Sequence, residues 1–296
     1  MDARKFYLNP SAYGMPTRDE LVAMRIWDSH YHGFQSSPQP IKQHQETMYY
    51  VERMGIERVI AFDVGGTWQR PLVDTDFETQ KWEILVKDQD RGVSGIIPIE
   101  PSYPEKSLAK MEKWIRHGPC IGIKYSGGNE AGVSCNHPNN DPIIKLAVEL
   151  NAVIYIHTWL KVGGTPPRSG GGNSPGESSP MDVARLAQRY PGVSLICGHS
   201  GGDWELGVRA IRPFKNVVLE FAGSDPHSGA VDHAVRELGA DRIVWGGHGP
   251  SRSFATELGK VLDADLTNAD RMKIFGGNYR RLAAPIFRKK GLKIVL

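Results

Sequence analysis

The chain has 296 residues, of which 40% are hydrophobic and 23% charged, and its formal net charge is +3. This length and composition are typical of a globular protein with a large core. The small net charge and the lack of lysine/arginine runs argue against nucleic acid and anionic membranes as partners. No apolar run approaches the roughly 18 to 20 residues that a transmembrane helix needs.

The N-terminus carries charges but no apolar segment, so we expect no signal peptide in the sequence as written. The three cysteines lie in a long chain, two of them in apolar strand-like runs, which indicates buried thiols rather than a disulfide framework. These features predict a cytoplasmic protein. The alternative that a leader peptide was removed from the sequence as written stays open.

Short apolar, β-branched runs recur along the chain at intervals long enough for a strand, a helix and two loops. The predicted strands are residues 25–32, 58–64, 93–99, 120–125, 153–158, 193–199, 217–222 and 243–247. The predicted helices include residues 43–54, 77–90, 142–150, 181–190 and 229–238.

Eight strand–helix units predict a (β/α)8 TIM barrel of the α/β class. We expect residues 26–290 to form this single barrel and residues 1–25 to form an N-terminal extension. A doubly wound open sheet is the alternative, but the "DVGGTW" turn lacks the spacing of a dinucleotide-binding motif and the lysine of a P-loop. The Gly/Pro/Ser-rich residues 163–180 follow the fifth strand, where we expect either a lid loop over the active face or a plain surface loop.

Half of the ten histidines lie at predicted strand ends, and in a parallel barrel these ends meet on one face. His30 and His32 stand two apart on one strand, so both side chains point to the same side. A divalent metal or a hydrogen-bonded core pair explains two such rings, and we expect Asp28 to accept a hydrogen bond from one of them. The strand-end histidines are His30, His32, His157, His199 and His248.

Six motifs together resemble the amidohydrolase superfamily, over nearly the whole chain. They are "DSHYHG", "GIKYSGG", "IHTW", "CGHSGGDW", "GADRIVWGGHGPSRSF" and "IFGGNYRRLA". The resemblance is closest to the amidohydrolase-2 branch, which holds small-molecule hydrolases and non-oxidative decarboxylases related to aminocarboxymuconate-semialdehyde decarboxylase. It implies a mononuclear site for one divalent ion, with zinc expected because imidazole suits it and manganese as the alternative.

The resemblance also assigns roles to single residues. It implies that His30, His32 and His157 bind the metal and that His199 is catalytic or binds a second metal. Lys124 stands where binuclear members of the superfamily carry a carbamylated lysine.

The eighth predicted strand departs from the family pattern. The family places a metal-binding aspartate where this chain has His248. We expect His248 to face the metal as a fourth nitrogen ligand, or to act beside His199 as a catalytic base.

Three interpretations of function stay open. The main one is a metal-dependent hydrolase of a small carboxylated, lactone, amide or ester substrate. The first alternative is a metal-dependent non-oxidative decarboxylase, and the second is a natural or engineered barrel that binds metal or ligand but catalyses poorly. We expect a small-molecule substrate and allow for a homodimer. The residues expected to bind the substrate are Lys124, Tyr125, Trp159 and Arg252.

Overall fold

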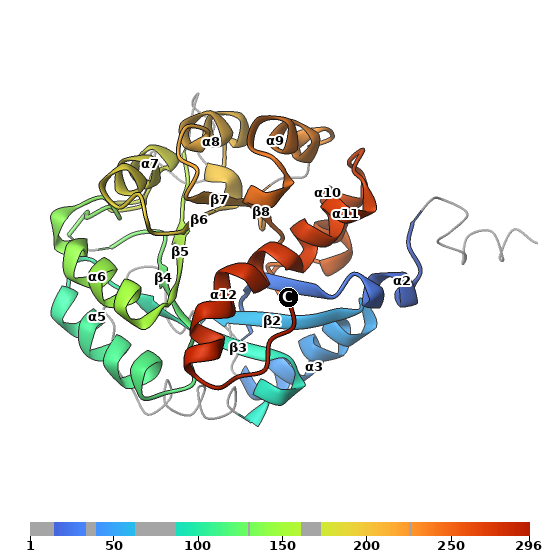
Figure 1. Ribbon diagram of the computed structural model, residues 1–296, viewed down its shortest axis with the longest axis horizontal. Helices are drawn as coiled ribbons and strands as arrows, with labels where there is room; N and C mark the ends of the chain where they lie inside the picture. The colour runs from blue at the N-terminus through green and yellow to red at the C-terminus, as the bar shows by residue number, and fades with distance from the viewer. Residues whose placement is uncertain (1–14, 34–39, 63–86, 130, 161–172, 225–226) are drawn as a thin grey trace, which may run out of the picture.

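The structure of the protein is a computed structural model that describes residues 15–33, 40–62, 87–129, 131–160, 173–224 and 227–296. Eight parallel strands form one sheet in the order of the chain, as a TIM barrel requires (Figure 1). The predicted fold class is therefore confirmed. The strands are β1 (Ile26–Tyr31), β2 (Ile56–Phe62), β3 (Val93–Ile99), β4 (Gly122–Tyr125), β5 (Val153–His157), β6 (Leu195–Gly198), β7 (Val217–Glu220) and β8 (Ile243–Val244).

The strands form where the sequence has apolar, β-branched runs, and nearly all of their residues are buried. Both faces of such strands are covered, one by the barrel interior and one by the outer helices. The barrel closes between β1 and the segment after β8, where the Ser29 N–H donates to the Trp245 carbonyl (3.1 Å) and the His248 N–H to the His30 carbonyl (2.7 Å). This closure brings the first and last motifs of the sequence side by side.

Helices surround the barrel (Figure 1). Two of them begin with a capping box, in which Thr17 and Ser179 exchange hydrogen bonds with the third residue of their helices. The helices are α2 (Arg18–Ala23), α3 (Pro40–Arg53), α5 (Pro104–Met111), α6 (Asp141–Leu150), α7 (Pro180–Arg189), α8 (Trp204–Ile211), α9 (Ala230–Leu238), α10 (Phe254–Leu262), α11 (Asn268–Met272) and α12 (Asn278–Lys289). Among the described helices, none is both long and apolar enough to cross a membrane.

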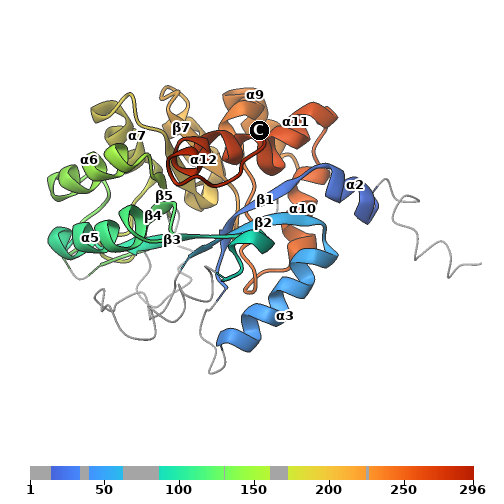
Figure 2. The ribbon, with the colours of Figure 1, turned by 60° about the horizontal axis from the view of Figure 1, so that its bottom comes forward.

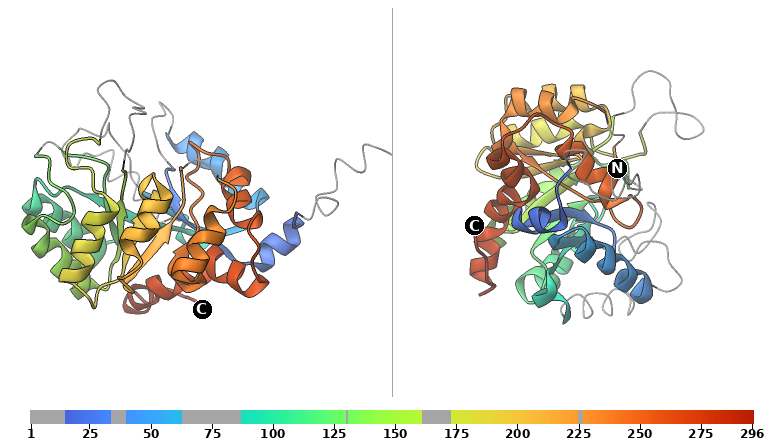
Figure 3. Two further views of the ribbon diagram at one scale, coloured as in Figure 1. Left: turned by 90° about the horizontal axis from the view of Figure 1, so that it is seen from above. Right: turned by 90° about the vertical axis from the view of Figure 1, so that its right-hand side faces the viewer.

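Helix α12 covers the end of the barrel at which the strands begin (Figures 2 and 3). Asn278 donates to the carbonyl oxygens of Ala240 and Ile243 at 2.7 Å each, just before and within β8. Arg280 donates to the Arg25 carbonyl, immediately before β1 (2.6 Å). The opposite end, where the strands finish, is the face that carries the strand-end histidines.

The sequence and the structure differ most at the eighth strand. The predicted strand spans residues 243–247, but β8 ends at Val244, because the next residue already pairs elsewhere: the Trp245 N–H donates to the Ile274 carbonyl (3.0 Å). Most of the predicted helix at 77–90, the "DVGGTW" turn at 63–68 and residues 163–172 of the predicted lid lie outside the described residues.

Candidate metal centre

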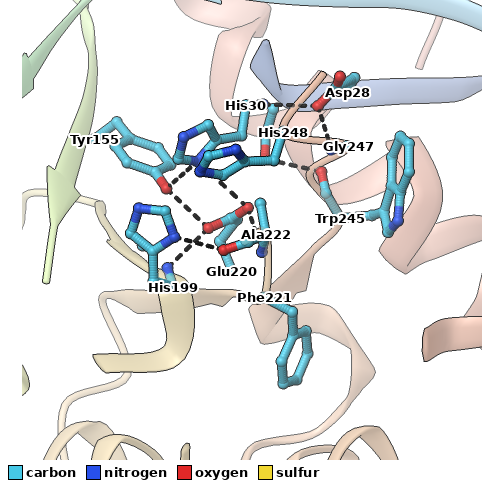
Figure 4. Close-up of polar contacts among 12 residues, drawn as sticks. Asp28, His30, Tyr155, His199, Glu220, Phe221, Ala222, Trp245, Gly247 and His248 are labelled. Atoms are coloured by element: carbon cyan, nitrogen blue, oxygen red, sulfur yellow. Dashed lines mark hydrogen bonds and ion pairs between the residues drawn. The ribbon is translucent and has the colours of Figure 1, made fainter. Parts of the chain in front are cut away.

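Three histidines from distant parts of the chain meet at the carboxyl end of the barrel (Figure 4). His30 lies on β1, His199 directly follows β6, and His248 lies in the turn after β8. One ring nitrogen from each lies within 4.8 Å of the other two, which is a spacing that one metal ion can bridge. We call His30, His199 and His248 the histidine trio.

The ring of His30 is oriented by a two-step hydrogen-bond chain. Its Nδ1 lies 2.6 Å from the Tyr155 hydroxyl, which in turn donates to Glu220 Oε2 at 2.8 Å (Figure 4). Because the tyrosine proton goes to the carboxylate, the His30 Nδ1–H donates to the tyrosine oxygen. This leaves the lone pair of His30 Nε2 facing the centre of the site.

The ring of His199 is oriented by the backbone. Its Nδ1 is hydrogen-bonded to the Ala222 carbonyl, and because a carbonyl only accepts, this nitrogen must carry the proton. The backbone of His199 is left-handed, with φ of +60°, and its N–H donates to Glu220 Oε2 at 2.9 Å. The same glutamate therefore supports both His30 and His199.

The ring of His248 is oriented by the next turn of the chain. Ser251 donates its hydroxyl proton to the His248 carbonyl at 2.9 Å, so the His248 Nδ1–H donates to the Ser251 oxygen at 2.6 Å. His248 also has a left-handed backbone, with φ of +52°. A non-glycine residue in this conformation is uncommon and is often found where a side chain is held for function.

All three rings of the trio thus hold their proton on Nδ1 and leave Nε2 unprotonated. Burial, together with the positive charge of Lys124, lowers the pKa of His30 well below its usual range. Burial and the neighbouring His157 do the same for His199, and burial and Lys124 lower the pKa of His248 to about 3. Neutral imidazoles with free Nε2 lone pairs fit a divalent metal, and the fixed Nδ1–H donors are the outer partners that metal-bound histidines have.

His32 lies beside the trio, as the two-residue spacing predicted. Its Nε2 is hydrogen-bonded to His30 Nε2 at 2.7 Å, so the two rings lie against each other at the centre of the site. Its Nδ1 is buried and has no hydrogen-bond partner within the described part of the chain. Burial and Lys124 lower the pKa of His32 well below its usual range, so this ring is also neutral.

His157 has a different partner from the trio. Its Nε2 lies 3.0 Å from Glu177 Oε1, and both side chains are buried. The His157 ring packs edge-on against the His199 ring, with 4.5 Å between their centroids. The structure therefore places His157 next to the site but pairs it with a carboxylate from the segment before α7, whereas the family resemblance implies a metal ligand.

Lys124 points into the site from β4. Its Nζ lies 3.4 Å from His30 Nε2 and 3.6 Å from the centre of the Phe62 ring. Burial lowers the pKa of this lysine to about 7, while the charge of Glu220 acts in the opposite direction. The site thus joins a cationic group to neutral imidazoles.

The prediction that Asp28 orients a histidine ring is wrong. Asp28 Oδ1 instead accepts the backbone N–H groups of His30 (2.8 Å) and Gly247 (2.6 Å), so it joins β1 to the end of β8. Backbone donors lie closer to this short side chain than the ring of the residue two places along the strand. Burial raises the pKa of Asp28 to about 7.

The residues predicted to bind substrate divide into two groups. Trp159 packs edge-on against His199, with 5.9 Å between ring centroids, and Arg252 lies at the exposed rim, where it donates to the Gly223 carbonyl at 3.4 Å. Tyr125 lies elsewhere, because it follows Lys124 on β4 and neighbouring strand residues point to opposite faces. It is buried between the barrel and its helices, where its pKa is raised by burial and by the neighbouring Cys135.

Two residues that touch the site were not predicted as site residues. Tyr155 lies two positions before His157 on β5, so its inward direction follows from strand alternation. Glu177 lies in the Gly/Pro/Ser-rich segment, where no periodic pattern indicates the direction of a side chain.

The sequence of the chain matches the family model described as Amidohydrolase over residues 29–282. The chain belongs to the amidohydrolase family. This agrees with the resemblance drawn from the six motifs. No curated protein sequence matches this amidohydrolase chain.

Solved structures with the same fold include several decarboxylases. One is the 5-carboxyvanillate decarboxylase of Sphingomonas paucimobilis, with 13% identity, a TM-score of 0.65 and coverage of 88% of this chain and 99% of that chain. The 5-carboxyvanillate decarboxylase of Novosphingobium aromaticivorans, complexed with manganese and 4-hydroxy-3-methoxy-5-nitrobenzoic acid, has 18% identity and a TM-score of 0.63, with 84% of each chain covered. A dihydroxybenzoic acid decarboxylase from Polaromonas, with manganese and the inhibitor 2-nitroresorcinol, has 15% identity, a TM-score of 0.64 and coverage of 88% and 96%.

Proposed function

We propose that this amidohydrolase-family chain is a metal-dependent decarboxylase that removes carbon dioxide from a small aromatic or unsaturated carboxylic acid. The observation that carries the proposal is the composition of the histidine trio and its surroundings. Neutral imidazoles converge on one point, and a buried lysine lies 3.4 Å from one of them. The fold likeness to decarboxylases that hold manganese agrees with this proposal.

The charge of the site favours an anionic substrate. His30, His199 and His248 would hold the metal, with His32 in reach. Because these ligands are neutral, a divalent ion would keep its full charge, and it would supply binding of the substrate carboxylate and stabilisation of the negative charge that develops in the reaction. Lys124 and the rim residue Arg252 add positive charge on the same face.

Decarboxylation needs a group that donates a proton to the substrate carbon, and the site contains one. The bond between the substrate carbon and its carboxylate breaks, the electron pair stays on that carbon, and the carbon takes up one proton as carbon dioxide leaves. Lys124 Nζ, with a pKa lowered to about 7, holds a proton that it can give at neutral pH. Trp159 offers an apolar wall for a flat substrate.

Hydrolysis, the main interpretation from the sequence, has less support. It needs a group that takes a proton from the attacking water, and His248 stands in place of the family's aspartate. Two carboxylates beside the trio already accept hydrogen bonds from the protein: Asp28 Oδ1 accepts two backbone N–H groups, and Glu220 accepts the Tyr155 hydroxyl and two backbone N–H groups. Asp28 Oδ2 has no partner among the described residues, but both of its neighbouring hydrogen bonds hold this side chain against the backbone.

The test is a direct comparison of the two reactions. Protein loaded with manganese or with zinc is incubated with 2,6-dihydroxybenzoate and 5-carboxyvanillate, both 13C-labelled at the carboxyl carbon, and in parallel with activated esters and lactones. We expect release of labelled carbon dioxide that depends on the metal and is lost in His199→Ala. Metal-dependent hydrolysis without carbon dioxide release would contradict the proposal. Metal binding without either reaction would favour a barrel that binds metal but catalyses poorly.

A further inference from the structure

Helix α10 carries a buried ion pair that the chemistry above does not use. Lys260 Nζ lies 2.8 Å from Glu257 Oε2, and the side chains are 7% and 2% exposed. Lys260 Nζ also donates to the carbonyl oxygens of Phe221 (3.1 Å) and Ser224 (2.5 Å), so its ammonium group contacts three oxygen atoms. Burial of an ion pair is costly unless further hydrogen bonds support it, and here the two carbonyl oxygens supply that support to Lys260.

The carbonyl oxygens that Lys260 binds belong to the first and last residues of a short turn after β7. We call residues 221–224 the β7 turn. The Ala222 carbonyl in this turn accepts the Nδ1–H of His199, as Figure 4 shows. Gly223 packs against His248, because a Cβ atom built at this glycine would lie 2.6 Å from His248 Nε2 and 3.2 Å from His199 Nδ1. The β7 turn therefore contacts two members of the histidine trio.

Helix α10 also contacts the segment on either side of His248. The Glu257 carbonyl accepts the indole N–H of Trp245 at 2.9 Å, three residues before His248. Phe254, the first residue of α10, lies so close to Gly247 and Gly249 that a Cβ atom at either would clash with its ring. Helix α10 thus fixes the backbone on both sides of His248 and, through Lys260, the β7 turn.

We propose that Lys260, held by Glu257, is a positioning residue of the metal site. It clamps the β7 turn so that the Ala222 carbonyl keeps the His199 proton on Nδ1 and Gly223 keeps the His248 ring in place. This inference rests on the proposed metal site. It assigns Lys260 no contact with metal or substrate.

The test uses Lys260→Met in the full chain, with Lys273→Met as control. Lys273 also pairs with carboxylates, Asp241 and Asp270, but lies 41% exposed. In metal-free protein, 15N NMR of the histidine rings should show His199 protonated on Nδ1 in the wild type and as a mixture of tautomers in Lys260→Met. His30, which is held by Tyr155 instead, should keep its tautomer. The dissociation constant for manganese should rise about 10-fold, as expected when an outer partner of a metal-bound histidine is disturbed.

The proposal fails if Lys260→Met is folded and keeps both the His199 tautomer and the manganese affinity of the wild type. If this variant does not fold, Glu257→Gln removes the ion pair with almost no change in shape, and the same two measurements decide. Lys260→Arg, which retains the charge, should restore most of the manganese affinity. Both readouts are independent of turnover, so an absence of decarboxylation would overturn the proposed function and leave this test intact.

Discussion

The imidazole rings of His30 and His248 stack on each other, with 4.4 Å between their centroids and 23° between their planes. They come from the first and the last strand–turn units of the barrel and meet because the barrel closes there. Two stacked neutral imidazoles, His30 buried and His248 partly buried, gain little from each other, but a shared cation stabilises both. This relationship makes His248 a member of the site although the family pattern has aspartate at its position.

His248→Ala should therefore lose metal. One of three converging nitrogens disappears, so manganese affinity should fall by more than the about 10- to 100-fold that the loss of an outer partner costs. Elemental analysis after dialysis measures the manganese retained per chain. The control is His137→Ala, because His137 is exposed and lies outside the site. Full metal content in His248→Ala would remove His248 from the site.

Tyr155→Phe should weaken metal binding without a change of shape. The His30 Nδ1–H loses its acceptor and Glu220 loses its donor, so we expect about 10- to 100-fold weaker manganese binding and a stability loss of about 1 to 2 kcal/mol. Tyr125→Phe is the matched control, because Tyr125 is equally buried on the neighbouring strand and its hydroxyl has no partner in the described structure. Equal manganese affinities for the two variants would show that the hydrogen-bond chain from His30 through Tyr155 to Glu220 does not support the metal site.

Gly223→Ala should damage the site through the ring of His248. The new Cβ would lie 2.5 Å from His248 Cδ2, and the backbone φ of +71° adds a strain of about 1 to 2 kcal/mol. Gly229→Ala has the same kind of strain, with φ of +78° but no atom within 4 Å of its Cβ. We expect a lower melting temperature for Gly223→Ala, because of this added clash, and a loss of metal binding only in Gly223→Ala. Metal binding by both would show that the ring has room to move.

The stability of the metal-free protein should fall as the pH drops below about 6.5. Burial lowers the pKa of His30, His32, His199 and His248, so below that pH the unfolded chain binds protons that the folded chain does not.

Asp28 and Glu220, whose pKa values burial raises to about 7, oppose this effect, while the lowered pKa of His44 and the raised pKa of Glu257 offset each other. A net of about two protons therefore remains between pH 6.5 and 4.5. The free energy of unfolding should fall by about 3 kcal/mol per pH unit there. Urea unfolding measures the slope, which His248→Gln should reduce by about 1.4 kcal/mol per unit. A pH-independent stability would mean that about two of these four rings are charged in the folded state.

The fold was predictable because buried parallel strands leave a plain pattern. Runs such as Val153–His157 are buried throughout and apolar or aromatic up to the final histidine, and glycine or proline stops separate such runs from the helices. The pattern is weaker at the eighth strand, where the Trp245 carbonyl still accepts from Ser29 of β1 but the Trp245 N–H donates to the Ile274 carbonyl outside the sheet.

The candidate site was predictable only in part. Strand ends and two-residue spacing located the strand-end histidines, and the family resemblance located Lys124, but the sequence does not say which hydrogen bond a side chain makes. Asp28 therefore proved to bind backbone, and Glu177 came from a loop that has no periodic pattern. Tyr125 was predicted to bind substrate, but Lys124 points into the barrel, so the next residue on the strand points outward to the helices.

The most direct test of the account is anomalous diffraction at the manganese edge, on crystals of the protein loaded with manganese. We predict a single peak about 2 to 2.3 Å from the Nε2 atoms of His30, His199 and His248, with Lys124 beside it and unbound. A peak bound by His157 and Glu177 and away from His248, or no peak at full manganese loading, would contradict the account.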